Sequence, residues 1–537
     1  NPGEDTSALK GGAASTEAPA EVKDTIVYSQ FSDCGNVLNY LTADSREAMS
    51  LAAYINDGLF VLMPDGSYRF KIAESFEPSA DGLTYTAKIK SGLKWSDGTD
   101  LTIDDVIYSF ETYMANSPSL SVNGQNAVIN KIDDTTIEFV LPGALASFPE
   151  SVADVPMLAK HIFEGKDSLD MDLTDAANVV GCGPYKFASW EYDSIQIYEK
   201  NPDHWNADKY NFDTVEVRIV PEMNARVQLF ESGQLDSFSP DANTIETYID
   251  DPRMVSYPSV MVYDYDINVK NPENPLSGNN NFEKALYHAM NREVIARDIY
   301  GYMEPTGTYI NGMAGALSES GLCYRDSEYG NAVEAMVESW GPYGYNPEMA
   351  LDYLNKAIAE CGVTDAQLPI KVKYCIDEGD TEWKALGEYL MEQWPTIFQG
   401  KMELEIIPYA GMSATDFKKT GDDKWDLSPN DWARSMSRTY PHTCFYYYLD
   451  SYSGRPNNYV VPEFDAQFQV CEDAKLGDYD NLLKETQKLE EMYLDYVIHV
   501  PVCQNINYEL FTDNIELPVK TYIPGFGWGA IFGDIVE

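Results

Sequence analysis

Basic residues are scarce in this chain. Its 537 residues include 37 lysines and arginines against 87 aspartates and glutamates, a formal net charge of −50 at pH 7. Nucleic-acid binders gain much of their affinity from basic side chains that neutralise phosphates, and anionic membrane surfaces attract basic segments in the same way. The composition therefore excludes a nucleic-acid-binding protein and predicts an acidic, well-solvated exterior.

Long apolar runs are also absent. A membrane-spanning helix needs about 20 mostly apolar residues in succession, and no segment of the sequence approaches this pattern. The chain does not open with a basic segment followed by an apolar one, so we expect it to be already processed. Residues 1–23 are rich in Gly, Ala, Ser, Thr, Pro and Glu, a composition typical of a flexible tether. A folded domain is expected to begin near Asp24.

Catalytic and metal-binding motifs are missing. The sequence has no phosphate-binding G-x-x-x-x-G-K-[ST] loop, no H-E-x-x-H and no G-x-S-x-G. Its five histidines are far apart, and its eight cysteines form no C-x-x-C pair. We therefore predict no enzyme activity, no cofactor and no metal ligands. A secreted hydrolase remains a remote alternative, because paired carboxylates of a glycosidase need no fixed spacing in sequence.

The cysteines are expected to be mostly free thiols, since a chain of this length can bury enough apolar surface without disulfides. Cys361 and Cys375 form the pair best placed for a disulfide, because the first ends a predicted helix and the second lies on the strand that follows.

The hydrophobic pattern is that of a mixed α/β protein with two or three domains. Asn346 and Pro347 are typical of a helix start, and Gly362 of its end. Another amphipathic helix is predicted for residues 480–496. Strand-like segments occur at 25–28, 136–141, 195–198, 215–220 and 370–376. In such folds, ligands bind near strand ends and between domains.

Residues 83–114 carry the most specific pattern. Apolar and polar residues alternate from Leu83 to Lys90, which predicts a half-buried strand, and Ser96-Asp97-Gly98 predicts a turn. Thr102 followed by Asp105 approximates a capping box, and the apolar residues after it recur at helical spacing. The segment therefore predicts a strand, a turn and a capped helix in immediate succession.

This arrangement resembles a signature of the peptide/nickel-type extracellular solute-binding proteins. Further blocks resemble that family in the same order, from about residue 24 to beyond residue 500: GCGPYKFASW at 181–190, NPDHW at 201–205, AR at 225–226 with GQLD at 233–236, FEKALYHAMNREVIARDI at 282–299, and the helix at 346–362.

The resemblance implies an α/β fold with two lobes and three domains, like that of periplasmic binding proteins with an extra inserted domain. Lobe I would combine residues 24–55, 180–282 and 502–537, the inserted domain would span 56–179, and lobe II would span 283–501. A hinge near residues 268–283 and 496–508 would let the lobes close over a ligand.

The function implied by the resemblance is that of a receptor for an ABC importer. Such a receptor captures oligopeptides in the cleft between the lobes and delivers them to the membrane permease. An oligosaccharide, or another small solute such as a nickel complex, is the alternative ligand. The resemblance further implies a monomer, either at the outer face of the cell membrane through a lipid anchor or in the periplasm.

The resemblance also suggests how the ends of a peptide would be held. Relatives carry a G-W-x-x-D element, whose tryptophan lines the cleft and whose aspartate pairs with the α-ammonium group. Trp432 matches the tryptophan, whereas Ser435 stands where the aspartate is expected, and a neutral hydroxyl cannot replace a charge-assisted hydrogen bond. Asp431 could supply the carboxylate from a shifted position, and Arg434 and Arg438 could hold a ligand carboxylate.

Backbone and aromatic contacts complete the predicted site. The resemblance implies that the first strand pairs with the peptide backbone, through Tyr28, Ser29, Gln30 and Ser32. Tyrosine side chains offer flat faces and hydroxyl groups, which suit peptide side chains and sugar rings alike. About half of the tyrosines near the predicted site are expected to serve packing alone. The aromatic candidates are Tyr263, Tyr265 and Tyr447.

Overall fold

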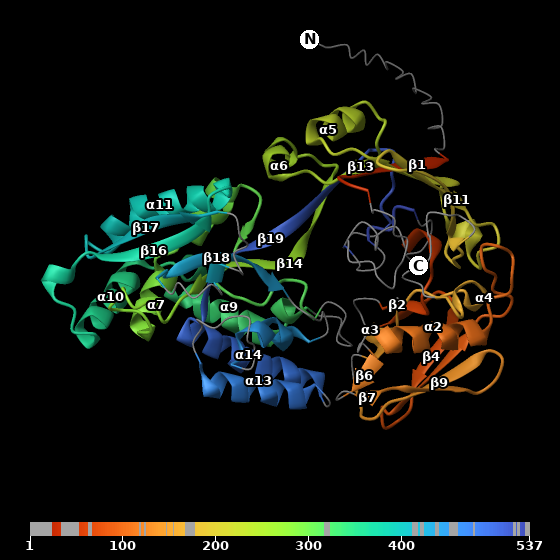
Figure 1. Ribbon diagram of the computed structural model, residues 1–537, viewed down its shortest axis with the longest axis horizontal. Coiled ribbons are helices and arrows are strands. Elements are labelled where there is room, and N and C mark those ends of the chain that lie inside the picture. The colour runs from red at the N-terminus through yellow and green to blue at the C-terminus, as the bar shows by residue number, and fades with distance from the viewer. Residues whose placement is uncertain are drawn as a thin grey trace, which may run out of the picture.

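A computed structural model shows two halves joined by a pair of long strands, β14 and β19 (Figure 1). The N-terminal sheet and the inserted sheet lie in one half, and most of the long sheet lies in the other. The structure describes residues 24–33, 53–62, 67–116, 120–122, 125–145, 148–153, 155–166, 178–315, 323–410, 417–418, 424–434, 440–450, 460–475, 478–518, 522 and 527–531.

The N-terminal sheet has four strands in the order β1-β12-β11-β10. Strand β1 (Thr25–Gln30) pairs in parallel with β12 (Thr214–Ile219), and β11 (Ile195–Lys200) and β10 (Tyr185–Glu191) continue the sheet in antiparallel fashion. The strands predicted at 25–28, 195–198 and 215–220 are therefore confirmed. Around the sheet lie η3 (Ala207–Lys209), α5 (Met223–Glu231), β13 (Ser237–Phe238) and α6 (Ala242–Tyr248).

The inserted sheet has the order β4-β5-β9-β8 and is antiparallel throughout. Its strands are β4 (Ala73–Pro78), β5 (Thr84–Ile89), β9 (Thr136–Val140) and β8 (Val128–Lys131). Helices α2 (Ile103–Asn116), α3 (Phe148–Ala153) and α4 (Lys160–Phe163) pack with it around a shared core. Two small hairpins accompany them, β2 (Phe60–Leu62) with β3 (Tyr68–Phe70) and β6 (Ser121–Val122) with β7 (Gln125–Asn126).

The strand, turn and helix predicted for residues 83–114 are confirmed. The backbone N–H and the hydroxyl of Thr102 both donate to Asp105 Oδ2, at 2.8 and 3.0 Å, and tie down the first turn of α2. Trp95 is fully buried beside this turn. The segment's role is therefore structural, because its most distinctive side chain is in the core of the inserted domain.

The GCGPY block owes its glycines to close packing against the segment that contains Ile55 and Asn56. A Cβ on Gly181 would lie 1.8 Å from the carbonyl oxygen of Ile55, and one on Gly183 would lie 2.4 Å from the backbone nitrogen of Asn56. Gly183 N–H also donates to Ile55 O at 2.8 Å. Only glycine allows the two backbones this approach.

Replacing Gly183 by alanine is expected to lower the free energy of unfolding by about 3 kcal/mol, the upper end of the usual cost of overpacking, because the clash is with backbone. Urea unfolding followed by tryptophan fluorescence measures the change. Gly379→Ala is the matched control, since the Cβ there meets only the flexible side chain of Asp377 at 3.3 Å. Equal costs for both variants would contradict the packing explanation.

The long sheet has seven strands. Six of them follow the order β13-β19-β14-β18-β16-β17, and β15 (Glu304–Pro305) pairs with β19. The other strands are β14 (Met254–Ile267), β16 (Ile370–Asp377), β17 (Met402–Tyr409), β18 (Leu427–Arg434) and β19 (His499–Phe511). The strand predicted at 370–376 is confirmed.

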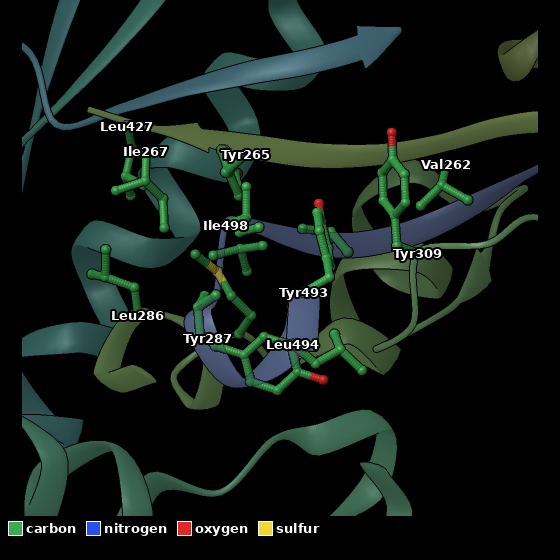
Figure 2. Close-up of a cluster of buried hydrophobic side chains, with 14 of the residues drawn as sticks. Val262, Tyr265, Ile267, Leu286, Tyr287, Tyr309, Leu427, Tyr493, Leu494 and Ile498 are labelled. Carbon is green, nitrogen blue, oxygen red and sulfur yellow. The ribbon is translucent and has the colours of Figure 1, made fainter. Parts of the chain in front are cut away.

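Helices pack on this sheet and bury the largest hydrophobic cluster, of which Figure 2 shows a part. Helix α10 has the predicted caps, since Asn346 Oδ1 accepts from the N–H groups of Glu348 and Met349, and Gly362 has φ +66°. The helix predicted at 480–496 is also confirmed. The helices are α7 (Asn280–His288), α8 (Arg292–Val294), η4 (Ile295–Tyr300), η5 (Tyr324–Asp326), α9 (Glu328–Trp340), η6 (Pro342–Gly344), α10 (Pro347–Glu360), η7 (Asp365–Gln367), α11 (Thr381–Ile397), η8 (Pro441–Tyr448), α13 (Pro462–Ala474) and α14 (Tyr479–Tyr496).

The crossing between the halves differs in part from the prediction. Strand β19 crosses largely within the predicted range 496–508, but the other crossing is β14, which ends at Ile267 before the predicted range 268–283 begins. The residues after Ile267 form a turn that is fastened to the long sheet, because Asn271 and Asn274 both donate to Asp426 Oδ1 at 2.8 Å. This turn is therefore anchored to the long sheet, and the predicted hinge at 268–283 stays a prediction.

All seven cysteines that the structure describes are free thiols, which confirms for these residues the prediction of mostly free thiols. Cys361 and Cys375 do not form a disulfide. Cys34 lies outside the described residues. In the part of the chain that the structure describes, no helix combines the length and apolarity needed to cross a bilayer.

Candidate ligand-binding site

A cavity of about 360 Å³ opens where the crossing strand β19 meets the segment that leads into α6. Its wall is formed by the residues after β13, by the two crossing strands, and by Tyr302, which lies between η4 and β15. The lining residues are Ser239, Pro240, Ala242, Ile245, Tyr257, Tyr302, Asn505, Ile506, Asn507, Tyr508 and Glu509.

The polar part of this wall comes from the pleat of β19. Asn505, Asn507 and Glu509 alternate with Ile506 and Tyr508, so the strand presents polar side chains on one face. The hydroxyl of Tyr508 donates to Tyr302 O at 3.0 Å and thereby ties the strand to the segment between η4 and β15. The position of the cavity wall is thus fixed by contacts on both sides of the crossing.

Glu509 is the carboxylic acid of this wall. Its Oε1 accepts a hydrogen bond from the hydroxyl of Ser237 at 2.7 Å. Burial disfavours the charged carboxylate and raises the pKa of Glu509 to about 7, although the hydroxyl of Ser237 and the indole N–H of Trp528 act in the opposite direction. The group is therefore balanced between its neutral and its charged form near neutral pH.

The first strand of the chain lies close to this acid. Burial raises the pKa of Tyr28 well above its usual range, and the nearby groups Tyr54 and Glu509 raise it further by their negative charge when ionised. Tyr28 also stacks on Tyr54, with ring centroids 6.5 Å apart. The predicted strand site and the cavity are therefore parts of one region.

One edge of β1 has no strand partner among the described residues. The carbonyl groups of Asp24 and Gln30 accept bonds from the β12 side, so the odd-numbered residues turn their backbone groups to the other edge. There Asp236 holds Val27, accepting from its N–H at 2.7 Å and donating to its carbonyl at 2.8 Å. The backbone groups of Ser29 and Phe31 follow on the same edge and have no bond within the described part of the chain.

The side chains of the predicted strand site divide into two groups. The atoms Ser29 Oγ and Gln30 Oε1 are buried, and neither has a hydrogen-bond partner among the residues that the structure describes. Ser32 is exposed at the end of the strand. Asp33 anchors this end, since its carboxylate accepts from Trp190 Nε1 at 2.9 Å and from Gln196 Nε2 at 2.8 Å.

Asp431, Trp432 and Arg434 belong to strand β18, which pairs with β14 in antiparallel register. On its other side, β18 pairs with β16 only at Leu427, so the rest of that edge has no strand partner among the described residues. Ser435 and Arg438 lie outside the described residues.

The three tyrosines predicted to contact a ligand have different environments. Tyr265 is fully buried within the long sheet's core (Figure 2), with its ring 5.6 Å from that of Tyr374. It is therefore a packing residue, and its inclusion in the ligand site was wrong. Tyr263 is half-buried, and the centroid of its ring lies 5.7 Å from that of Trp383. Tyr447 is half-buried on η8. Both side chains can therefore still offer part of a ring to a ligand.

A buried charged cluster joins the two crossing strands. His499 Nδ1 lies 3.0 Å from Asp264 Oδ2 and 2.7 Å from Asp266 Oδ1, and the hydroxyl of Tyr448 donates to Asp264 at 3.0 Å. These are donor types that bind divalent cations. However, Asp266 also pairs with Lys418, so protein side chains already supply positive charge here. We interpret the cluster as an electrostatic tie between β14 and β19.

Sequence reasoning did not find the cavity residues or this cluster. His499 and Asp264 are 235 positions apart, and no sequence motif predicts their contact. A signal for the cavity was present, because the alternation Asn505, Asn507, Glu509 predicts a strand with one polar face.

Comparison with known proteins gives a consistent result. The sequence model for the middle part of the bacterial extracellular solute-binding proteins, family 5, matches residues 68–454. The oligopeptide-binding protein OppA of Bacillus subtilis (strain 168) is 22% identical over 372 residues, which are 65% of this chain and 65% of that protein.

Solved structures agree with the fold. The ABC transporter substrate binding protein CtaP of Listeria monocytogenes superposes with a TM-score of 0.71 at 20% identity, over 91% of this chain and 94% of that chain. OppA of Haemophilus influenzae, in complex with the peptide RPPGFSPFR, gives a TM-score of 0.65 at 18% identity, over 95% and 99% of the two chains. At these identities, the similarity establishes the fold.

Proposed function

The chain belongs to the bacterial extracellular solute-binding proteins of family 5, and we propose that it captures short oligopeptides outside the cell membrane and delivers them to the permease of an ABC importer. The similarity to OppA supports the ligand class. The two long crossing strands support a closing motion of the halves, because they are the main connections between them. The named relatives are binding proteins, which supports a receptor without catalytic activity.

The open edge of β1 is the observation that carries the peptide assignment. Backbone groups of Ser29 and Phe31 point away from the N-terminal sheet and have no strand partner in the described part of the chain. An extended peptide can add to such an edge through its own main chain, and these bonds do not depend on the peptide's side chains. The edge of β18 that carries Asp431, Trp432 and Arg434 is proposed as a second contact, with Tyr263 and Tyr447 beside the ligand.

Backbone recognition predicts a specific response to N-methylation of the ligand. Native mass spectrometry of protein purified without refolding first identifies a bound peptide, which is then synthesised. Methylating a backbone nitrogen that pairs with a strand edge is expected to weaken binding at least tenfold, because the donor is lost and the methyl group blocks the edge. Replacing one side chain by alanine is expected to change affinity less than threefold at most positions.

Isothermal titration calorimetry measures both series. Greater sensitivity to side-chain replacement than to N-methylation would contradict pairing at the strand edge. Release of a sugar or a metal complex in place of peptides would overturn the ligand class itself.

We also propose that residues 1–23 tether the folded part to the membrane through a lipid anchor, and that the receptor acts as a monomer. The composition of this segment, poor in large apolar side chains, supports the tether. We further propose the lobe boundaries that the resemblance implies. Strand β19 spans the boundary at 501/502, and β14, which lies within predicted lobe I, belongs to the same sheet as strands of predicted lobe II.

A further inference from the structure

The cavity at the crossing has an unusual charge balance. Its lining contains one carboxylic acid, Glu509, and no lysine, arginine or histidine. Arg253, the residue before β14, is already engaged, since its Nη2 lies 2.8 Å from Asp251 Oδ2 and 3.1 Å from Glu231 Oε1. Within the described part of the chain, Glu509 therefore has no cation at hydrogen-bond distance. Its polar neighbours are neutral, namely the hydroxyl of Ser237, the indole of Trp528 and the phenols of Tyr28 and Tyr54.

A buried carboxylate without a cation is unfavourable, and a protein usually compensates it with a paired positive group. The raised pKa of Glu509, about 7, is the response of the acid to this environment. A ligand that brings a positive charge into the cavity would restore the balance. It would also form a charge-assisted hydrogen bond, which is stronger than a bond between neutral groups.

We propose that this cavity binds an ammonium or guanidinium group of the ligand and that Glu509 is its counter-ion. An ammonium has three N–H donors. Glu509 can accept one of them, and the amide oxygens of Asn505 and Asn507, on the same polar face of β19, can accept others. The ring of Tyr257, which pairs with Asn507 and so lies on the same face, would contact the methylene groups that carry the charge. This assignment rests on the proposed peptide function and specifies peptides with a basic group at this position.

The proposal predicts proton release on binding. Without ligand, Glu509 is partly protonated at pH 7, and a bound cation stabilises its charged form and expels the proton. Calorimetry of a basic peptide in buffers of different ionisation enthalpy is therefore expected to detect released protons at pH 6–7 in the wild type. Glu509→Gln is expected to show none from this site, because the amide does not titrate.

Three tripeptide pools test the assignment directly. The first contains lysine, the second has norleucine in its place, and the third is the norleucine pool with acetylated N-termini, which carries no ammonium group. For the wild type, loss of the ammonium that occupies the cavity is expected to weaken binding at least tenfold. Glu509→Gln is expected to bind all three pools within a factor of two. Glu405→Gln, an exposed position on the outermost strand β17, is the matched control and should behave like the wild type.

The outcomes separate this proposal from the peptide function. If the wild type and Glu509→Gln bind the pools alike, with the variant's fold confirmed by circular dichroism, the role of Glu509 is overturned and the peptide function stands. If no pool binds, the peptide function fails, and titration with 1,5-diaminopentane decides the cavity. Tenfold weaker binding by Glu509→Gln would then support the cation site, and absence of binding by the wild type would overturn it.

Discussion

Replacing Arg325 by methionine is expected to lower the free energy of unfolding by about 4 kcal/mol, as removal of one partner from a buried ion pair commonly does. Arg325 pairs with Glu490, a fully buried residue on α14. The same carboxylate oxygen of Glu490 accepts from the backbone N–H groups of Tyr309 and Ile310, each at 3.0 Å. Removal of the guanidinium would leave this carboxylate buried without its counter-ion.

The backbone geometry adds to the cost. Arg325 Nε donates to Ile310 O at 2.9 Å, so one side chain fastens the segment at 309–310 through both the carbonyl and the carboxylate. Burial alone would lower the pKa of Arg325, but the charge of Glu490 raises it above the usual value, so the guanidinium stays charged. The pair therefore holds the start of η5, the segment at 309–310 and α14 together in the core around Tyr493, part of which Figure 2 shows.

Urea unfolding measures this prediction, and a second substitution makes it specific. The double variant Arg325→Met with Glu490→Gln is expected to recover at least about 1 kcal/mol, because the uncompensated charge is gone. Lys371→Met is the control, since Lys371 pairs with Glu403 at 3.7 Å with both side chains largely exposed. That variant is expected to change stability by less than about 0.5 kcal/mol. Equal effects for the exposed and the buried pair would contradict the explanation.

Local signals in the sequence predicted local structure well. The capping residues Thr102 and Asn346 mark helix starts because their partners are only two or three positions away, so sequence spacing alone defines the contact. Strands with alternating residues were found for the same reason. The glycines at 181 and 183 were recognised as a motif, but their reason, the contact with the segment containing Ile55, is visible only in three dimensions.

The candidate site was harder to predict because its chemistry comes from residues far apart in the chain. The pKa of Glu509 is raised by burial that exists only in the folded chain, and its hydrogen-bond partner Ser237 is 272 positions away in sequence. Tyr265 resembles its neighbour Tyr263 in sequence, yet the fold buries Tyr265 completely and leaves Tyr263 half-buried. Alternation along β14 predicts that the two point the same way, but it does not say how deeply each is covered.

Hinge placement shows a related limit. A pattern of apolar residues indicates where a strand lies, but whether the strand stops at a domain boundary depends on its partners. β14 continues through the crossing because β19 pairs with it along most of its length, from Met254 to Asp266. The turn after it lies in the range where the resemblance implied a hinge, and its bonds to the buried Asp426 attach it to the long sheet.

Between pH 5 and pH 8, the ligand-free wild type is expected to lose about 2.5 kcal/mol of stability relative to Glu509→Gln. The pKa of Glu509 is raised from 4.5 to about 7 in the folded state, so between these values the folded protein binds this proton more tightly than the unfolded chain. The stabilisation is fully present below the unfolded pKa and is lost as pH rises through the folded pKa. Each tenfold difference in proton affinity is worth about 1.4 kcal/mol.

Urea unfolding of ligand-free wild type, Glu509→Gln and the exposed control Glu405→Gln across this range tests the prediction. Other titrating groups contribute to all three proteins equally, so the difference between the first two isolates Glu509. A parallel pH dependence in all three would mean that Glu509 is not a buried neutral acid. A saturating basic peptide is expected to remove the difference at high pH, because the cation then compensates the carboxylate. Persistence of the full difference would show that the peptide's charge does not enter the cavity. The instability of the empty site and the preference for a basic ligand have one electrostatic cause, so this experiment can refute both.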